Sequence, residues 1–172
     1  MITLIDGKGQ LGTLLSNLIS NKEVSEDIVI YHTWNVEDKS EETQRNCYEK
    51  FKKFTDENKN IKIIFISTYS QTDNPYNYYK QLSEAYLLSN HLTGKVIRFP
   101  ALIGKGTCEK FKNNEIEAFG EMELISVRDA AEKVLEFALS KDKIRNLRIY
   151  GDKVSAKLAK ELILFGKEIL SS

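Results

Sequence analysis

Three kinds of feature are scarce or missing in this chain of 172 residues. The two cysteines, Cys47 and Cys108, lie far apart and form no CxxC pattern. They indicate neither a disulfide framework nor a zinc motif, so we expect a reducing compartment and no metal site. Basic and acidic residues balance at 25 each, which gives no sign of a nucleic-acid or anionic-membrane surface. No apolar run approaches the length of a membrane span or of a secretory signal. We therefore expect a soluble, cytoplasmic protein without nucleic-acid or membrane partners.

The first twenty residues combine an expected strand, a glycine-rich turn and an expected helix. Residues 2–5 form a short apolar run typical of a strand that is buried on both faces. The turn reads Asp6-Gly7-Lys8-Gly9-Gln10-Leu11-Gly12, and leucines recur at helical spacing after it. Glycines let a backbone turn tightly and approach a pyrophosphate, to which a helix N-terminus offers free N–H groups. This context predicts cofactor contacts from Gly7, Lys8, Gly9, Gln10, Leu11 and Gly12. The alternative is a tight turn that holds no ligand.

Strands and helices alternate along the rest of the chain. We expect strands at residues 28–31, 61–66, 95–99, 122–125 and 147–150. We expect helices from Ser40 to about residue 57, from Asp73 or Asn74 to the closing Thr93-Gly94, and at 127–139 and 154–170. Residues 101–114 are expected to form a glycine-containing loop with one helical turn near 109–112. The alternation favours a mainly parallel sheet of five or six strands between two helix layers, a Rossmann-like α/β sandwich formed by one domain over residues 1–172.

Right-handed crossovers favour the strand order 2-1-3-4-5, which reverses beside the glycine turn. Ligands of such sheets bind at the carboxyl ends of the strands at the reversal. The loops after the first four strands should meet there, which makes His32, Thr33 and Pro100 further candidate cofactor contacts. His32 either touches a ligand or is a polar cap at the end of its strand.

A second candidate site combines the strand end Ser67-Thr68 with Tyr76 and Lys80. Tyr76 and Lys80 are four residues apart on an expected helix and therefore share a face. A lysine beside a phenol lowers the pKa of the phenol, which can then give or take a proton while a nicotinamide exchanges hydride. The hydroxyl of Thr68 could bond the same substrate oxygen. The alternative is a tyrosine-rich helix start with a chance YxxxK spacing.

Five segments, in order, resemble the extended short-chain dehydrogenase/reductase family of nucleotide-sugar epimerases, dehydratases and reductases. Residues 5–12 are similar to the TGGxGFIG loop, and their GQLG ending resembles that of dTDP-4-dehydrorhamnose reductases. The other segments resemble the strand that ends in the catalytic Ser/Thr, the NPYxxSK helix start, the LRPxNVYGP segment and the IHVDDVA helix start (residues 64–68, 74–80, 96–104 and 125–131).

The resemblance implies a role for each matched residue. Gly7, Gly9 and Gly12 would form the loop for NAD or NADP, and Thr68 would be a hydroxyl donor. Tyr76 would be the acid/base, and Lys80 would support the phenolate and the ribose. The resemblance also implies a nucleotide-sugar substrate, held by a vestigial substrate segment at about residues 101–125.

The chain departs from the family in several places. It is much shorter, and residues 28–31 with the loop after them resemble a later strand of the family. If they correspond to that strand, the strand whose end holds an acid for the adenosine ribose is missing. No acid directly follows Ile30 or Tyr31 in any case, so nothing selects NAD over NADP. Asp6 stands where the first loop glycine sits, so its carboxylate either opposes a pyrophosphate or turns away and caps the loop. The stretch from Thr68 to Tyr76 is short. The reduced lid leaves a site open to water unless another subunit covers it, which suggests a homo-oligomer.

Two main functions remain open from the sequence. The first is an NAD(P)-dependent reductase or epimerase that acts on a nucleotide-activated sugar or a related carbonyl or hydroxyl substrate, and the intact Thr68, Tyr76 and Lys80 favour it. The second is a catalytically inactive Rossmann-fold binding module or partner subunit in a sugar or polysaccharide pathway. Asp6, the short stretch before Tyr76 and the missing ribose acid favour the second. A flavin- or nucleotide-binding module is a third alternative.

Overall fold

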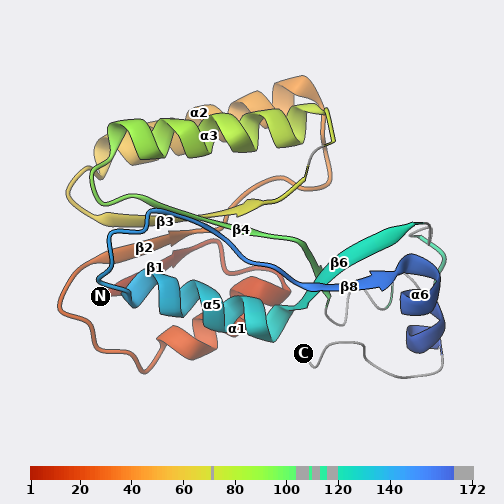
Figure 1. Ribbon diagram of the computed structural model, residues 1–172. Coiled ribbons are helices and arrows are strands. Elements are labelled where there is room, and N and C mark those ends of the chain that lie inside the picture. Colours follow the sequence, from red (N-terminus) through yellow and green to blue (C-terminus); the bar gives the residue numbers. More distant parts are fainter. Residues whose placement is uncertain (71, 104–108, 110–112, 116–119, 165–172) are drawn as a thin grey trace.

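The computed structural model describes residues 1–70, 72–103, 109, 113–115 and 120–164. They form a five-stranded main sheet between two helix layers, with a three-stranded sheet at one end (Figure 1). The main sheet holds β1 (Ile2–Ile5), β2 (Ile28–Tyr31), β3 (Lys62–Thr68), β4 (Lys95–Phe99) and β7 (Asn146–Arg148), all parallel. The small sheet holds β5 (Ala101–Ile103), β6 (Glu121–Ser126) and β8 (Asp152–Ser155). The predicted Rossmann-like α/β class is confirmed.

Two helices cover each face of the main sheet (Figure 1). Helices α2 (Glu41–Glu57) and α3 (Pro75–Asn90) lie on one face, and α1 (Gln10–Ile19) and α5 (Val127–Leu139) lie on the other. Helix α6 (Ala156–Leu164) follows β8. The side chains of Ser40, Asn74 and Ser126 accept backbone N–H groups at the starts of α2, α3 and α5. These caps fix where the helices begin, because they satisfy donors that have no partner within the helix. The caps at Ser40 and Asn74 were predicted and are confirmed.

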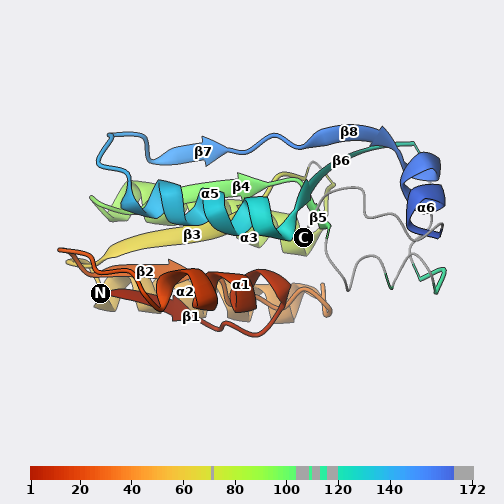
Figure 2. The ribbon, with the colours of Figure 1, turned by 90° about the horizontal axis from the view of Figure 1, so that it is seen from below.

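The strand order differs from the predicted 2-1-3-4-5. The observed order is β1-β2-β3-β4-β7, so β1 lies at the edge and no reversal occurs beside the glycine turn (Figure 2). The steps from β1 to β2 and from β2 to β3 cross the sheet in the same direction, yet α1 and α2 lie on opposite faces. These two crossovers therefore have opposite hands. The prediction failed because it assumed right-handed crossovers throughout.

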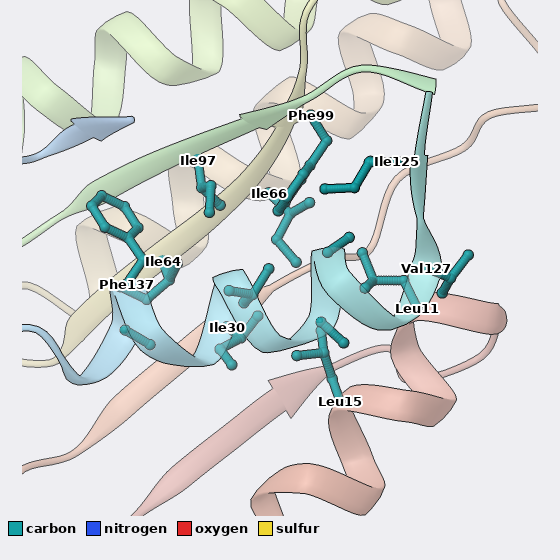
Figure 3. Close-up of a cluster of buried hydrophobic side chains, with 14 of the residues drawn as sticks. Leu11, Leu15, Ile30, Ile64, Ile66, Ile97, Phe99, Ile125, Val127 and Phe137 are labelled. Atoms are coloured by element: carbon teal, nitrogen blue, oxygen red, sulfur yellow. The ribbon is translucent and has the colours of Figure 1, made fainter. Parts of the chain in front are cut away.

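Side chains of the central strands alternate between two hydrophobic cores. In β3, Ile64 and Ile66 face α1 and α5, whereas Ile63 and Phe65 face α2 and α3. Figure 3 shows the first core, where Leu11 and other side chains from α1 and α5 meet the isoleucines of the sheet. Burial on both faces explains why these strands read as continuous apolar runs.

Several boundaries also differ from the predictions. Residues 101–103, an expected loop, form β5 parallel to β6, and residues 152–155, expected in a helix, form β8 antiparallel to β6. Helix α3 ends at Asn90, before the expected Thr93-Gly94, and β7 ends at Arg148. Pairing with β6 decides β5 and β8, and such tertiary pairing overrides weak local preference. The expected turn at 109–112 lies outside the described residues except for residue 109, as does the expected helix after residue 164.

None of the helices that the structure describes combines the length and the apolar character needed to cross a lipid bilayer.

Candidate functional site

The turn between β1 and α1 is tight and open on one side. A Cβ on Gly12 would lie 2.6 Å from the carbonyl carbon of Gly7, so this close contact requires glycine. A Cβ on Gly9, whose φ is 155°, would meet nothing within 4 Å. No side chain caps α1 at Gly9. The first backbone N–H groups of α1 are therefore left as donors for an anion.

Asp6 joins the loops that follow β1 and β2. It has a φ of 60°, and its Oδ1 accepts the backbone N–H of Lys8 at 3.3 Å. Its Oδ2 accepts the hydroxyl of Thr33 at 3.2 Å. The carboxylate thus caps the loop, one of the two arrangements expected from the sequence, and it occupies one backbone donor of the turn.

A pocket of about 560 Å³ lies at the carboxyl ends of β1 and β2. Four predicted cofactor contacts line it, together with an aromatic side chain, two acids and neighbouring loop residues (Asp6, Lys8, Gly9, His32, Thr33, Trp34, Asn35, Val36 and Glu37). The two loops therefore meet in space, even though the sheet does not reverse between them.

The other predicted cofactor contacts have different positions. Gly7 and Gly12 shape the turn through their close approach, and Gln10 begins α1. The side chain of Leu11 is buried in the core between α1 and the sheet, so only its backbone can serve a ligand. Pro100 is buried after β4, two strands away from β2, and it is not among the described residues that line the pocket.

Lys80 connects the predicted catalytic helix with this pocket. Its Nζ donates to the carbonyl oxygen of Ile66 at 2.9 Å and lies 4.7 Å from the centroids of the Trp34 and Phe65 rings. Burial lowers the pKa of Lys80 to about 7. Burial also lowers the pKa of His32 to about 4, and the charge of Lys80 contributes to that lowering. The structure thus places Lys80 against Trp34 of the pocket lining, and the charge of Lys80 also acts on His32.

The prediction that Lys80 lowers the pKa of Tyr76 is wrong. Burial raises the pKa of Tyr76 to about 12. The ammonium of Lys80 lies 6.0 Å from the centroid of the Tyr76 ring, over its face, and Lys39 lies 5.6 Å from the same centroid. Because Lys80 donates to a backbone carbonyl and contacts aromatic faces, it does not favour the phenolate. At neutral pH Tyr76 is a protonated phenol.

The register of β3 and β4 separates the two hydroxyls at the end of β3. Thr68 pairs with Phe99, which belongs to the core beneath α1 and α5, whereas Ser67 pairs with Arg98. Arg98 reaches Glu84 of α3, with Nε 2.9 Å from Oε2, so Ser67 lies on the same face as Lys80. The Oγ of Ser67 is buried without a hydrogen-bond partner among the described residues. The sequence analysis named the Ser67-Thr68 strand end and gave the hydroxyl role to Thr68, whereas strand alternation gives Ser67 the face of the Tyr76 helix.

No group of three or more His, Cys, Asp and Glu side chains in the described part of the chain could hold a metal ion.

The strand and helix arrangement and the glycine turn define a Rossmann-like α/β class of protein. No family model matches the chain, and no curated protein matches it in sequence. Solved structures do match. The UDP-N-acetylglucosamine 4-epimerase of Bacillus cereus is 18% identical with a TM-score of 0.79, and the match covers 98% of this chain and 83% of that one.

Two further matches were solved with nucleotides bound. The dTDP-4-dehydrorhamnose reductase of Bacillus anthracis, in complex with NADP, is 15% identical with a TM-score of 0.78, and the match covers 98% and 82% of the two chains. WbmG of Bordetella bronchiseptica, in complex with NAD and UDP, is 11% identical with a TM-score of 0.74, and the match covers 99% and 80%.

These solved structures belong to the extended short-chain dehydrogenase/reductases, and the chain has their fold. The resemblance predicted from five short segments is therefore confirmed for the fold. At this level of identity the activity has to be argued from the site.

Proposed function

We propose that this chain is an NAD(P)-dependent reductase or epimerase that acts on a carbonyl or hydroxyl of a nucleotide-activated sugar. One observation supports this most directly: Lys80 of the Tyr76–Lys80 pair lies 4.7 Å from the centroid of the Trp34 ring, and Trp34 lines the glycine-turn pocket. The solved structures with the same fold include a sugar-nucleotide epimerase and a sugar-nucleotide reductase.

The pocket fits part of the implied cofactor. The open side of Gly9 and the uncapped start of α1 suit a pyrophosphate, with Lys8 as a cation beside it. Asp6 already holds one backbone donor of the turn, which leaves fewer donors for the phosphates. When bound, a reduced nicotinamide would supply a hydride to a substrate carbonyl carbon.

The residues of the chain would then control the proton. Tyr76, with a pKa raised to about 12 by burial, keeps its proton at neutral pH and is suited to donate it to the carbonyl oxygen. Removal of a proton from a substrate hydroxyl would need the phenolate, which this environment disfavours. Donation of the proton also leaves a phenolate, so burial of Tyr76 disfavours both directions and does not select reduction over epimerisation.

Binding and turnover test this proposal separately. At about a hundredfold excess over Kd, NADH or NADPH should stabilise the fold by about 3 kcal/mol in a thermal unfolding experiment. The variant Tyr76→Phe should keep that stabilisation and lose oxidation of NADH with a dTDP- or UDP-4-keto sugar. Absence of any stabilisation at millimolar cofactor contradicts the enzyme proposal, and unchanged turnover in Tyr76→Phe refutes the role of the phenol.

A second candidate is an inactive binding module or partner subunit in a sugar or polysaccharide pathway. The bond from the Lys8 backbone N–H to Asp6, together with the edge position of β1, favours it. Normal cofactor stabilisation with no turnover on any keto-sugar nucleotide would select this candidate.

The proposal also includes a nucleotide-sugar substrate, the segment that would bind it, and a second copy of the chain. The substrate segment at about residues 101–125, whose described parts include β5 and most of β6, would contribute to a nucleotide-sugar site. A second copy of the chain would cover the open pocket. Light scattering with and without NADH tests the second copy, because a shift from monomer to dimer on binding is the expected result.

A further inference from the structure

The edge strand β1 marks where this sheet departs from a complete dinucleotide-binding sheet. A complete sheet has two mononucleotide-binding halves in the strand order 3-2-1-4-5-6, and the dinucleotide lies across the reversal between strands 1 and 4. In this chain β1 pairs with β2 on one side, and none of the described residues pairs with its other side (Figure 2). One half of the complete sheet is therefore absent from the described residues.

The hands of the crossovers identify the absent half. In the order 3-2-1-4-5-6, the connection from strand 1 to strand 2 runs across the sheet in one direction. The connection from strand 4 to strand 5 runs in the opposite direction. Right-handed crossovers then place the two following helices on opposite faces. If strands 2 and 3 are removed, the helix after strand 1 and the helix after strand 4 still lie on opposite faces, and strand 1 lies at the edge beside strand 4. This is the arrangement of α1 and α2 and of β1 and β2 in this chain. Thus β1 corresponds to strand 1 and β2 to strand 4, and the absent half is the one that carries the acid for the adenosine ribose.

The pocket lining leads to the same conclusion. Directly after β2, the pocket lining has His32 and Thr33 where a ribose-binding carboxylate would be expected. The hydroxyl of Thr33 donates a hydrogen bond to Asp6. Lys8 is the one cationic side chain among the described residues that line the pocket, and Asp6 and Glu37 oppose it. The lining thus provides a cation for a bridging phosphate and none for a phosphate on the ribose 2′ position.

We propose that the pocket recognises only the nicotinamide mononucleotide half of a pyridine dinucleotide, while the adenosine end makes no contact with the protein. This inference rests on the proposed function, because it requires that a nicotinamide nucleotide binds. The turn between β1 and α1, with Lys8, would hold the phosphates, and Trp34 and Lys80 would be available to the nicotinamide end. The chain does not distinguish NAD from NADP, because the phosphate that distinguishes them lies on the adenosine ribose.

Isothermal titration of the full chain with four probes tests the proposal. The probes are NADH, NADPH, reduced nicotinamide mononucleotide and AMP. NADH and NADPH should bind within about threefold of each other, and the mononucleotide within about tenfold of NADH, differences of less than about 1.5 kcal/mol. AMP should show no heat of binding at millimolar concentration.

Two matched lysine variants test whether the nicotinamide mononucleotide half, which both probes contain, accounts for the binding. Lys8→Ala should weaken the binding of NADH and of the reduced mononucleotide by the same factor, about fivefold for one exposed charge beside a phosphate. Lys22→Ala removes the same charge from an exposed position outside the pocket lining and should leave both affinities unchanged. A loss on Lys8→Ala for NADH alone would contradict the proposal.

The outcomes separate this inference from the function on which it rests. If NADH binds more than about a hundredfold tighter than the mononucleotide, the adenosine end is recognised and the inference is wrong, while the proposed function stands. A tenfold preference between NADH and NADPH, or measurable binding of AMP, has the same meaning. If neither NADH nor the mononucleotide binds to the folded chain, the proposed function itself fails and the inference fails with it.

Discussion

At the scale of single residues, burial sets the charge of the groups around the candidate site. Lys80 is 5% exposed, and its ammonium has a carbonyl oxygen and two aromatic faces as neighbours in place of water. Glu84, one helical turn further along α3, raises the pKa of Lys80, but this effect is smaller than that of burial. The lysine therefore lies near half protonation at neutral pH, while Tyr76 stays protonated.

The first prediction concerns the pH dependence of stability. Between the folded pKa of Lys80, about 7, and its unfolded value of 10.5, the unfolded chain binds a proton that the folded chain lacks. Stability should therefore rise with pH, by about 3 kcal/mol between pH 7 and 9.5 from this group. Lys80→Met should remove that rise in urea unfolding experiments, and the exposed Lys22→Met should keep it. Parallel pH profiles for wild type and Lys80→Met would contradict the assignment.

The residue types of the candidate site could be predicted from the sequence, but their environments could not. The YxxxK spacing and the glycine turn are local patterns, so the sequence alone is enough to predict Tyr76, Lys80 and Gly12 as candidate residues. The sign of the Tyr76 pKa shift was wrong because it depends on burial and on the direction of the Lys80 side chain, both set by packing. The sequence does not decide between Ser67 and Thr68, because the pairing of β3 with β4 determines which hydroxyl faces α3.

At the scale of elements, the helices and central strands follow from local signals. Capping residues and the apolar runs located α2, α3, α5 and the first four strands. The strand order could not be derived in the same way, because it depends on the hand of each crossover, and the connections through α1 and α5 have the opposite hand to those through α2 and α3. The reversed hand at the β1–α1–β2 connection places β1 at the edge and leaves the glycine turn beside β2. The turn is kept in place by the contact between Gly7 and Gly12.

The second prediction tests that contact. Gly12→Ala places a Cβ at 2.6 Å from the Gly7 carbonyl carbon, so α1 must move away from the loop. We expect a loss of about 1–3 kcal/mol in the free energy of unfolding, as for other overpacked sites, together with weaker cofactor binding. Asn17→Ala, on the exposed side of the same helix, should change stability by less than about 0.5 kcal/mol. Unchanged stability and binding in Gly12→Ala would show that the loop and helix are not in close contact.

At the scale of the whole molecule, two sheets of different character meet. The main sheet is parallel and covered on both faces, whereas the small sheet combines the parallel pair β5–β6 with the antiparallel β8 (Figure 1). The chain passes from one sheet to the other after β4 and again after β7. At the second passage, a Cβ on Gly151 would lie 2.2 Å from the carbonyl oxygen of Leu124, so the connection packs directly against β6.

Glu123 of β6 holds the connection between β7 and β8 against the small sheet, and the last prediction concerns this residue. Its Oε2 accepts a hydrogen bond from Nη2 of Arg148 in β7 at 3.1 Å. Its Oε1 accepts a hydrogen bond from the backbone N–H of Gly151 at 2.9 Å. The guanidinium of Arg148 also lies over the rings of Tyr69 and Tyr150, with its carbon 3.3 and 4.3 Å from their centroids. One carboxylate thus joins the last strand of the main sheet to the small sheet.

Glu123→Ala should loosen the small sheet without disturbing the centre of the main sheet. It removes the charged partner of Arg148 and the acceptor of Gly151, at a cost of about 2–3 kcal/mol for partly buried groups. Amide hydrogen exchange should become faster in β6 and β8, while β2 and β3 keep their protection, because a local opening exposes only the unit that it releases. Glu121→Ala, an exposed residue of the same strand, is the matched control and should change neither. Equal acceleration in β3 and β6 would mean that the two sheets open together, and that Glu123 stabilises the whole fold rather than the junction.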